Sequence, residues 1–346
     1  AKLKVGRGRY ISVFDAKSSF FQIPIRESDK WLTTVITPIG LVEFNCVSMG
    51  LLNSSREWVR LIEMVLAPIS DICVPYVDDI AVVTETSFED HLVHIERFLA
   101  EIRKAKITLN LRKCEFIKPE VTFVGHIVGS GKHRPDPSRI EALKNLPRPR
   151  TKTQLRSVMG SFQFFRPYLP RLAEISKCLT DLTAKKMPSI LRWEDRHEKA
   201  FSDLKQALCD VHCMHSPVLG RPYYLRCDSS DYAVGCSLGQ LDECGNELPI
   251  AYASQKLTDV QKRWSVLERE AYACIWSLNK FRSLILFSKI HLFSDHRPLS
   301  FLTKATSGNN SKLIRWSLAL QEFDLDFNYT PGKSNVVADM ASRLVE

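Results

Sequence analysis

Acidic residues stand beside short apolar segments early in the chain. Asp15 directly follows the apolar residues 10–14, and Asp78 and Asp79 interrupt the apolar stretch VPYVDDIAVVT. A tight hairpin turn would place both of the paired carboxylates at its tip. If strand pairing brings all three acids together, divalent cations such as Mg²⁺ must offset their repulsion. Two such ions about 4 Å apart can activate an attacking hydroxyl group and stabilise the leaving oxygen in phosphoryl transfer. The alternative is an ordinary acidic turn.

A second series of acidic residues lies in the last third of the chain. Asp228 ends a strand-like segment, Glu270 lies in a long helical pattern, Asp295 ends a later strand-like segment, and Asp339 lies in the last helical pattern. Any one of these acids alone is more often a surface residue. The series therefore indicates a site only if the fold brings its members together.

Hydrophobic periodicity predicts the elements that must position these acids. Ser87 is the expected N-cap of a helix, because Asp90 follows three residues later and apolar residues then recur at helical spacing. Prolines between residues 135 and 149 break the chain into short elements, and a linker is expected at 217–222. The residues after this linker are predicted to form an α/β domain with three leading antiparallel strands. The predicted strands are 10–14, 72–77, 223–227, 233–238, 250–254, 290–293 and 325–329. One predicted helix begins at residue 88, and the others cover 152–164, 194–208, 260–282, 313–321 and 335–344.

The positive charge is concentrated in one segment. The chain of 346 residues has a net charge of +9, and residues 103–156 hold 14 Lys and Arg residues against 4 Asp and Glu residues. A concentrated basic segment indicates a polyanionic partner, most often nucleic acid, because neutralised phosphates release counterions. The alternative is a solvated surface face.

The composition excludes several classes of protein. With 45% hydrophobic and 25% charged residues, the chain is typical of globular proteins and unlike disordered, collagen-like or coiled-coil chains. No stretch approaches the roughly 20 apolar residues that a membrane span needs, and the opening AKLKVGRGRY is not followed by a signal-peptide pattern. Ten cysteines without regular spacing suit a reducing compartment. We therefore expect a cytoplasmic or nuclear protein, neither secreted nor membrane-bound.

Five motifs occur in an order that resembles a known family. They are FDAKSSFFQIPI, SMGLLNSSREW, PYVDDIAVV, LNLRKCEF and FVGHIV, followed by LPRPRTKTQLRSVMGSFQFFRPYLP. Their order and intervals are similar to the reverse transcriptase palm and following segment of the Pol polyprotein of gypsy-like long-terminal-repeat retrotransposons. The motif SMGLLNSSREW departs from the usual PFGLxNAP pattern, which affects the nucleotide site but leaves the three acids intact.

This resemblance implies roles for residues of the first half of the chain. Asp15, Asp78 and Asp79 match the metal-binding polymerase triad, with Asp79 the more replaceable of the pair. Phe20 matches the aromatic gate that excludes a ribose 2′-OH, with a buried core aromatic as the alternative. The remaining matches, each of which could equally be structural, are the nucleotide-binding Met49 and Gly50 and the primer-end residues Phe123, Gly125 and His126.

The resemblance also identifies the second series of acids as the Asp, Glu, Asp, Asp set of ribonuclease H. The matching blocks are LRCDSSDYAVG, LEREAYACI, FSDHRPL and NVVADMASR. Glu270 is preferred to Glu268 because it directly precedes the apolar AYACI, and residues two apart on a helix point roughly 200° away from each other. Asp228 is preferred to Asp231, a turn residue expected to be solvated. The predicted catalytic and metal-binding residues are thus Asp228, Glu270, Asp295 and Asp339.

The expected architecture is multidomain, combining α+β and α/β domains. It comprises a right-hand polymerase palm over residues 1–120 with most of the fingers missing, a thumb-like or connection region over 121–215, and a ribonuclease H-like α/β domain over 216–346. Because only 14 residues precede the first aspartate, an N-terminally truncated fragment of a polyprotein is expected. In the basic segment, the expected nucleic-acid contacts are Lys144, Arg148 and Arg150.

The function that the resemblance implies is that of an RNA-directed DNA polymerase with ribonuclease H activity. Each active site would use two Mg²⁺ ions, with Mn²⁺ as a substitute. The expected partners are RNA template, DNA primer, RNA:DNA hybrid and deoxynucleoside triphosphates, in a retrotransposon particle in the cytoplasm or in the nucleus. Two alternatives remain open: a non-catalytic nucleic-acid-binding relic, and a ribonuclease H active alone beside a dead polymerase. The sequence leaves the oligomeric state open.

Overall fold

The computed structural model describes residues 1–346 except 171, 212, 296–310 and 330–346. The chain forms two compact units, Ala1–His133 and Arg134–Glu346. The first unit extends past residue 120 because residues after it, including Phe123 and Val128, share a hydrophobic cluster with Ile11. The region predicted over 121–215 is therefore divided between the two units.

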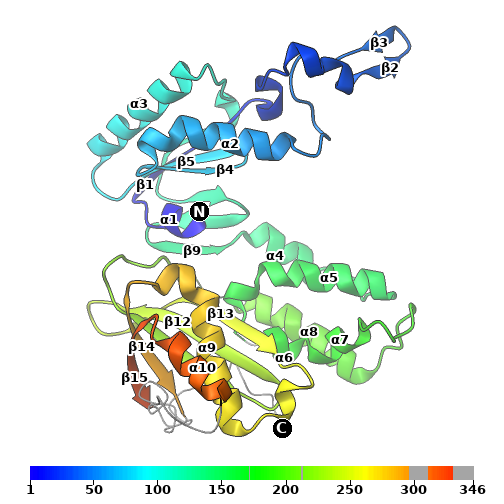
Figure 1. Ribbon diagram of the computed structural model, residues 1–346, viewed down its shortest axis with the longest axis vertical. Helices are drawn as coiled ribbons and strands as arrows, with labels where there is room; N and C mark the ends of the chain where they lie inside the picture. Colours follow the sequence, from blue (N-terminus) through cyan, green and yellow to red (C-terminus); the bar gives the residue numbers. More distant parts are fainter. Residues whose placement is uncertain (171, 212, 296–310, 330–346) are drawn as a thin grey trace. The chain divides into compact units, whose positions relative to one another are not determined.

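The first unit is built on a four-stranded sheet, with the strands in the order β4-β5-β1-β6 (Figure 1). Each neighbouring pair is antiparallel. Successive residues of β1 face opposite sides, so that Phe14 and Val13 belong to different hydrophobic clusters. Both predicted strands of this unit are confirmed. The strand bounds are β1 Tyr10–Asp15, β4 Cys73–Tyr76, β5 Asp79–Thr84 and β6 Glu115–Lys118.

Helices α2 and α3 cover one face of this sheet (Figure 1). Trp58 and Ile62 of α2 and Phe98 of α3 pack with Phe14 in one buried cluster. Ser87 caps α3, because its side chain accepts the backbone N–H of Asp90 at 3.1 Å, as predicted. Strand β9, Lys132–Pro135, begins in the first unit and ends in the second. The bounds of the other elements are α1 Lys2–Gly6, β2 Val35–Thr37, β3 Gly40–Val42, α2 Ser54–Leu66, α3 Phe88–Lys104, β7 Val121–Phe123 and β8 His126–Gly129.

A buried histidine ties α3 to the two central strands. The ring of His91 is fully buried, and its nitrogens lie 2.8 Å from the hydroxyl oxygens of Ser12 on β1 and Thr84 on β5. Burial, followed by the neighbouring His94, lowers the pKa of His91. The imidazole therefore remains neutral and fixes the strand β1 that ends at Asp15.

The second unit begins with helices. Capping boxes start α5 and α8, and the second of these uses Glu194 and His197. Both helices were predicted within a residue of their bounds, and their apolar faces meet in one buried cluster that includes Leu155, Phe162 and Leu204. The bounds are α4 Pro137–Lys144, α5 Lys152–Phe164, α6 Leu172–Ile175, α7 Lys177–Leu182, α8 Asp195–Cys209 and β10 Met214–His215.

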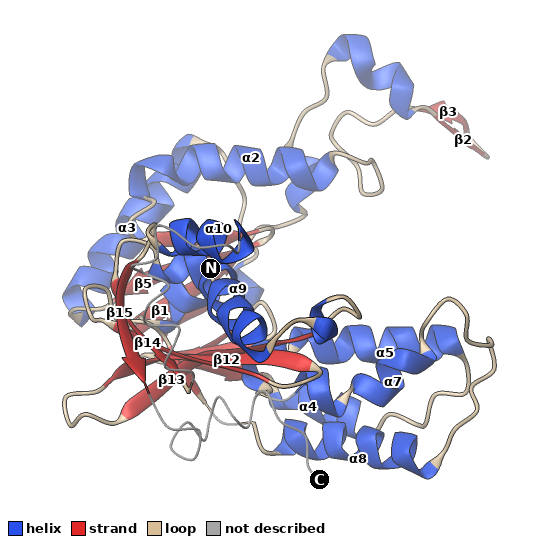
Figure 2. Cartoon of the chain, turned by 60° about the horizontal axis from the view of Figure 1, so that its bottom comes forward, coloured by secondary structure: helices blue, strands red, loops and turns tan. Residues whose placement is uncertain are grey.

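A five-stranded sheet follows, in the order β13-β12-β11-β14-β15. The strands β11, β12 and β13 are antiparallel, as predicted, whereas β14 pairs in parallel with both β11 and β15. Figure 2 shows α9 lying against this sheet, and their side chains form one hydrophobic cluster. The bounds are β11 Tyr223–Ser229, β12 Ala233–Leu241, β13 Glu247–Lys256, α9 Val266–Ile285, β14 Lys289–Ser294, α10 Ser311–Leu320 and β15 Asp324–Tyr329.

The long helix α9 begins six residues later than the expected position 260. Ser265 accepts the N–H of Glu268, and the Glu268 carboxylate accepts the N–H of Ser265, so this capping box sets the start of the helix. Residues Gln261–Arg263 form a separate 3₁₀ turn. The helix predicted over 335–344 lies outside the described residues. Among the described residues, no helix has both the length and the apolar character needed to cross a bilayer.

Candidate active sites

The turn between β4 and β5 holds the paired aspartates of the first unit. Tyr76 pairs with Asp79, so Val77 and Asp78 form the turn and Asp79 already belongs to β5. Val77 has φ 53°, a conformation that costs a β-branched residue on the order of 1 kcal/mol or more. The indole Nε1 of Trp58 donates to the carbonyl oxygen of Val77 at 2.7 Å. The buried Trp58 thus holds the strained turn in place.

The fold brings the three predicted polymerase acids together. Asp15 is the direct partner of Asp79 across β1 and β5, and the N–H of Ala16 donates to the Asp78 carbonyl at 3.1 Å. Burial, followed by the charges of Asp15 and Asp78, raises the pKa of Asp79. Nζ of Lys113 lies 3.7 Å from Oδ2 of Asp15, a neighbour that the sequence motifs did not single out.

One atom of this group fits a cation ligand in particular. Oδ1 of Asp78 is buried, and no hydrogen bond reaches it from the residues that the structure describes. A buried carboxylate oxygen is costly without a partner, and a divalent cation is such a partner. The three acids therefore offer the oxygen ligands that Mg²⁺ prefers, but among the described residues their ligand atoms do not all lie within 4.8 Å of one another.

The residues predicted to bind the incoming nucleotide are less enclosed than the acids. Phe20 lies on the 3₁₀ helix Ser19–Gln22 and packs, partly buried, against the Phe14 cluster. Met49 is 68% exposed. A Cβ added to Gly50 would meet no atom within 4 Å, although its φ of +94° favours glycine. Met49 and Gly50 therefore stand beside open space, and the role of all three residues stays a prediction.

The predicted primer-end loop is a tight turn between β7 and β8. Phe123 pairs with His126, and Val124 and Gly125 form the turn with φ values of 52° and 73°. The Phe123 ring is fully buried in the cluster of Ile11 and Val128, so this side chain serves the turn from within the fold, and the role of the turn at the primer end stays a prediction. Its apolar surface is used to hold the turn. Gly125 and His126 are buried as well, and Nδ1 of His126 donates to the Val124 carbonyl at 3.0 Å.

The second unit holds a tighter acidic cluster. Asp228 lies near the end of β11, and Asp295 follows β14 directly. Because these strands are parallel neighbours, their carboxyl ends meet at one edge of the sheet. Glu270 reaches the same place from α9, and the ligand atoms of the three residues lie within 4.8 Å of one another. Asp339, the fourth predicted member, lies outside the described residues.

Glu270, and not Glu268, faces this cluster. Glu270 is only 5% exposed, whereas Glu268 caps α9 and pairs with Lys312 at 3.2 Å. The Ser229 hydroxyl donates to Oε1 of Glu270 at 2.7 Å, while Oε2 is buried and has no hydrogen-bond partner within the described part of the chain. Burial, opposed in part by the Ser229 hydrogen bond, raises the pKa of Glu270 to about 7. Such an oxygen fits a cation ligand.

We expect the metal-free protein to lose stability as the pH rises through the folded pKa of Glu270. That pKa of about 7 lies above the ordinary 4.5, so the stabilising effect is complete below pH 4.5 and lost as the pH passes 7. The difference corresponds to about 3 kcal/mol. Urea unfolding at pH 5 and pH 8 in a chelator measures it. Glu270→Gln should raise the free energy of unfolding at pH 8 and remove this part of the pH dependence. An unchanged profile would contradict the burial of this acid.

The neighbouring turn contains an ion pair that sequence motifs did not predict. Asp231 was expected to be solvated, and its side chain is 75% exposed, but Nη1 of Arg269 also lies 2.6 Å from its Oδ1. Arg269 directly precedes Glu270, and its side chain is mostly buried. The pair therefore links the turn after Asp228 to the helix that carries Glu270.

The basic segment 103–156 is only partly available to a polyanion. Lys152 donates to the Met187 carbonyl at 2.7 Å and Arg156 to the Thr183 carbonyl at 2.8 Å, so these cations support the helical fold. The predicted contacts Lys144, Arg148 and Arg150 are exposed. These three side chains are the better candidates for phosphate binding.

Comparisons with known proteins match a different family to each of the two segments that carry an acidic cluster. Residues 2–128 match the family described as reverse transcriptase (RNA-dependent DNA polymerase), and residues 218–323 match the RNase H-like domain found in reverse transcriptase. A structure of the foamy viral protease-reverse transcriptase in complex with RNA/DNA hybrid has a similar fold, with a TM-score of 0.80 and 23% identity over 95% of this chain and 45% of that chain.

Two curated relatives from Drosophila melanogaster extend over nearly the whole chain. The Retrovirus-related Pol polyprotein from transposon opus is 33% identical over 98% of this chain and 35% of its own length. The Retrovirus-related Pol polyprotein from transposon gypsy is 29% identical over 98% of this chain and 33% of its own length. The chain thus spans about a third of the length of these relatives. With both family matches and both acidic clusters in the expected order, the chain belongs to the Pol polyproteins of gypsy-like retrotransposons, of which it carries the reverse transcriptase and RNase H-like segments.

Proposed function

We propose that the chain copies RNA into DNA at the carboxylates of the first unit and cleaves the RNA of RNA:DNA hybrids at those of the second. The observation that carries the proposal is the cluster of Asp228, Glu270 and Asp295, with ligand atoms within 4.8 Å of one another. Carboxylates are held this close where a site binds cations. Hybrid cleavage therefore has the stronger geometric support.

The residues of the second cluster have distinct tasks in hybrid cleavage. Bound Mg²⁺ would supply a water activated for attack on the phosphodiester. Asp228 and Asp295 would hold the ions from two strand ends, and Glu270 from α9. The hydrogen bond from Ser229 to Oε1 orients Glu270 and leaves Oε2 for a cation. The low exposure of Asp228 and Glu270 excludes bulk water and strengthens their electrostatic interactions.

The first unit would perform nucleotidyl transfer with the same kind of ions. Asp15 and Asp78 would hold the cations, and Asp79 would support them from β5. The Asp78 turn is kept rigid by Trp58, so the carboxylate is positioned before substrate binds. Phe20, Met49 and Gly50 would line the path of the deoxynucleoside triphosphate, and Gly125 and His126 would support the primer end.

A nucleic-acid partner is supported by charge and by similarity. The foamy viral protein with the similar fold is in complex with RNA/DNA hybrid. The chain has a net charge of +9, and Lys144, Arg148 and Arg150 are exposed. We propose that these side chains bind the phosphates of template-primer and hybrid.

We expect charge reversal at these three positions to reduce the salt dependence of binding. Log K falls by about 0.9 per neutralised phosphate per decade of salt, so the triple change to Glu should reduce the slope by up to about 3. Hybrid binding measured by fluorescence anisotropy across salt concentrations tests this. The control is triple reversal at the exposed Lys185, Lys186 and Lys199. Equal slopes for both triple variants would remove the basic segment from the binding surface.

Cleavage and extension assays on the full chain test the proposed function. We expect Mg²⁺-dependent cutting of a labelled RNA:DNA hybrid, and weaker extension of a DNA primer on an RNA template, because Met49 and Gly50 stand in open space. EDTA should abolish both. Binding without cutting at any hybrid concentration would favour the non-catalytic alternative, and cutting without extension would favour a ribonuclease H beside an inactive polymerase.

A further inference from the structure

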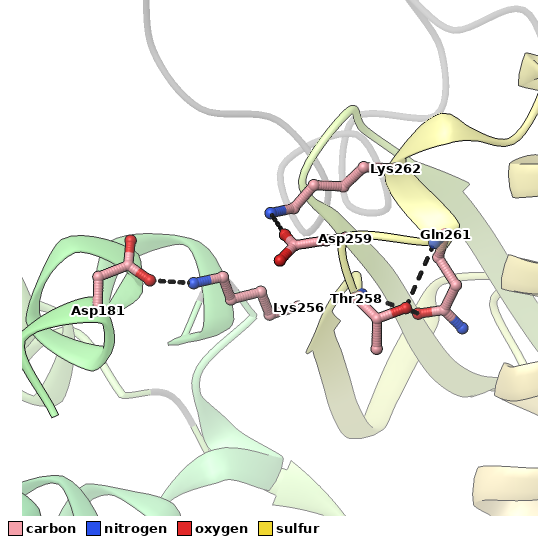
Figure 3. Close-up of polar contacts among 6 residues, drawn as sticks. All are labelled: Asp181, Lys256, Thr258, Asp259, Gln261 and Lys262. Carbon is pink, nitrogen blue, oxygen red and sulfur yellow. Dashed lines mark hydrogen bonds and ion pairs between the residues drawn. The ribbon is translucent and has the colours of Figure 1, made fainter. Parts of the chain in front are cut away.

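Helical residues of the second unit contact the carboxylate-bearing sheet through a set of contacts that we call the seam. The seam comprises Arg166, Ala173, Lys177 and Asp181 on the helical side and Tyr232, Ser254 and Lys256 on the sheet side. Figure 3 shows one of its contacts, the ion pair between Asp181 and Lys256. All seven residues belong to the unit Arg134–Glu346.

The seam supplies hydrogen-bond partners to the side of an edge strand that pairs with no other strand of its sheet. β13 is the first strand of its sheet, so one row of its backbone groups lacks a neighbouring strand. Nη2 of Arg166 donates to the carbonyl oxygen of Ser254, and the N–H of Ala173 donates to the Ser254 hydroxyl oxygen at 3.1 Å. Ser254 is fully buried, so both contacts serve groups without access to water. Arg166 thus takes the place of a further strand.

A second part of the seam contacts the turn that follows Asp228. Residues 230–232 link β11 to β12, and Nζ of Lys177 lies 3.1 Å from the centroid of the Tyr232 ring. The carbonyl of Tyr232 also accepts the N–H of Leu257 at 2.7 Å. Together with the ion pair from Arg269 to Asp231, these contacts hold the turn from three elements.

The seam also reaches the segment that leads from β13 into α9. The ion pair between Asp181 and Lys256 fixes the last residue of β13, as Figure 3 shows. The next residues form local contacts, with the Thr258 N–H donating to Gln261 at 2.9 Å and Lys262 pairing with Asp259 at 2.8 Å (Figure 3). The helical residues therefore contact both the turn after Asp228 and the strand that precedes the Glu270 helix.

We propose that Lys177 and Arg166 are positioning residues for the carboxylate cluster of the second unit. Asp228, Glu270 and Asp295 repel one another without cations, so their spacing depends on the elements that hold them. Neither positioning residue is expected to touch the hybrid. Loss of either contact lets the turn or the edge strand shift, which weakens metal binding and slows cleavage while the affinity for hybrid stays the same. This inference rests on the proposed hybrid cleavage.

The test compares Lys177→Met with Lys177→Arg in the full chain. Loss of a group bonded directly to a metal ligand typically costs about 10- to 100-fold in metal affinity or activity. Lys177 acts at one step further, through Tyr232, so we expect the lower end of this range. We expect Lys177→Met to lower kcat about 10-fold and to raise the Mg²⁺ concentration at half-maximal rate, with KM for hybrid unchanged. Lys177→Arg should recover most of the loss, because a guanidinium also stacks on Tyr232. The control is Lys199→Met, an exposed lysine of α8.

Two outcomes overturn the inference. One is a Lys177→Met protein with the kcat and Mg²⁺ dependence of the parent, and the other is a change confined to KM, which would make Lys177 a hybrid contact. Tyr232→Leu, which removes the ring and leaves the lysine, should reproduce the effect of Lys177→Met. Arg166→Met should likewise lower kcat and raise the Mg²⁺ concentration at half-maximal rate. Circular dichroism verifies that each variant is folded.

A measurement of Mg²⁺ binding distinguishes a failure of this inference from a failure of the proposed function. If the parent chain binds Mg²⁺ in calorimetry but cuts no hybrid, the proposed function fails. The inference then stands if Lys177→Met weakens Mg²⁺ binding by about 10-fold, and fails if the two proteins bind equally. If the parent cuts hybrid and Lys177→Met cuts equally well at every Mg²⁺ concentration, only the inference fails.

Discussion

Asp228→Asn is expected to lower the rate of RNA:DNA hybrid cleavage by about 10³-fold or more, because it removes a charged ligand from the centre of the cation site. Asp228 is 3% exposed and lies with Glu270 and Asp295 in one cluster. In the metal-free protein the same change relieves repulsion between carboxylates, so the free energy of unfolding should stay the same or rise. Steady-state cleavage in Mg²⁺ and urea unfolding in a chelator measure the two effects.

A surface acid of the same unit provides the matched control for this prediction. Asp203 is exposed on α8, and the Asp203→Asn protein should cleave hybrid at the rate of the parent. Hybrid affinity, measured in Ca²⁺ or without metal, should differ little between Asp228→Asn and the parent. A folded Asp228→Asn protein that cuts as fast as the parent contradicts the assignment of the site.

The second large effect is expected at the turn of the first unit. Asp78→Asn should reduce primer extension by about 10³-fold, because the buried Oδ1 that fits a cation loses its charge. The turn itself should persist, since Trp58 holds the Val77 carbonyl and Ala16 donates to the backbone of residue 78. Binding of template-primer should remain near that of the parent, because the phosphate contacts that we propose, Lys144, Arg148 and Arg150, are exposed side chains of the second unit.

The size of the effect should depend on the position of the acid in this turn. Asp79→Asn should cost less than Asp78→Asn, because Asp79 lies in β5 as the partner of Asp15 and plays a supporting part. Asp71→Asn is the control, since Asp71 is an exposed acid near Arg97 at 3.8 Å. Single-nucleotide incorporation on an RNA template separates the three variants. Extension that survives Asp78→Asn at the rate of the parent would remove this turn from the polymerase site.

Local sequence signals predicted most elements of both units. Short apolar segments located β1 and β11, and the Ser87 and Asp90 pair located the start of α3. These signals are short-range, since they depend on pleat direction and on hydrogen bonds within one turn of helix. The start of α9 was placed too early because the apolar Val260 and Trp264 precede the capping residue Ser265, and the residues between them form a separate 3₁₀ turn.

Motifs of adjacent residues were sufficient to identify the family, the order of the two segments and the acids to consider. Which side chains are available to a ligand depends on tertiary packing. Phe123 is buried because β7 packs against β1, a contact between residues more than 100 positions apart. Glu270 faces Asp228 through the packing of α9 on the sheet. Nζ of Lys177, on α7, lies against the ring of Tyr232, 55 positions further along the chain. Burial and charge pairing of this kind arise from long-range packing, which no local pattern encodes.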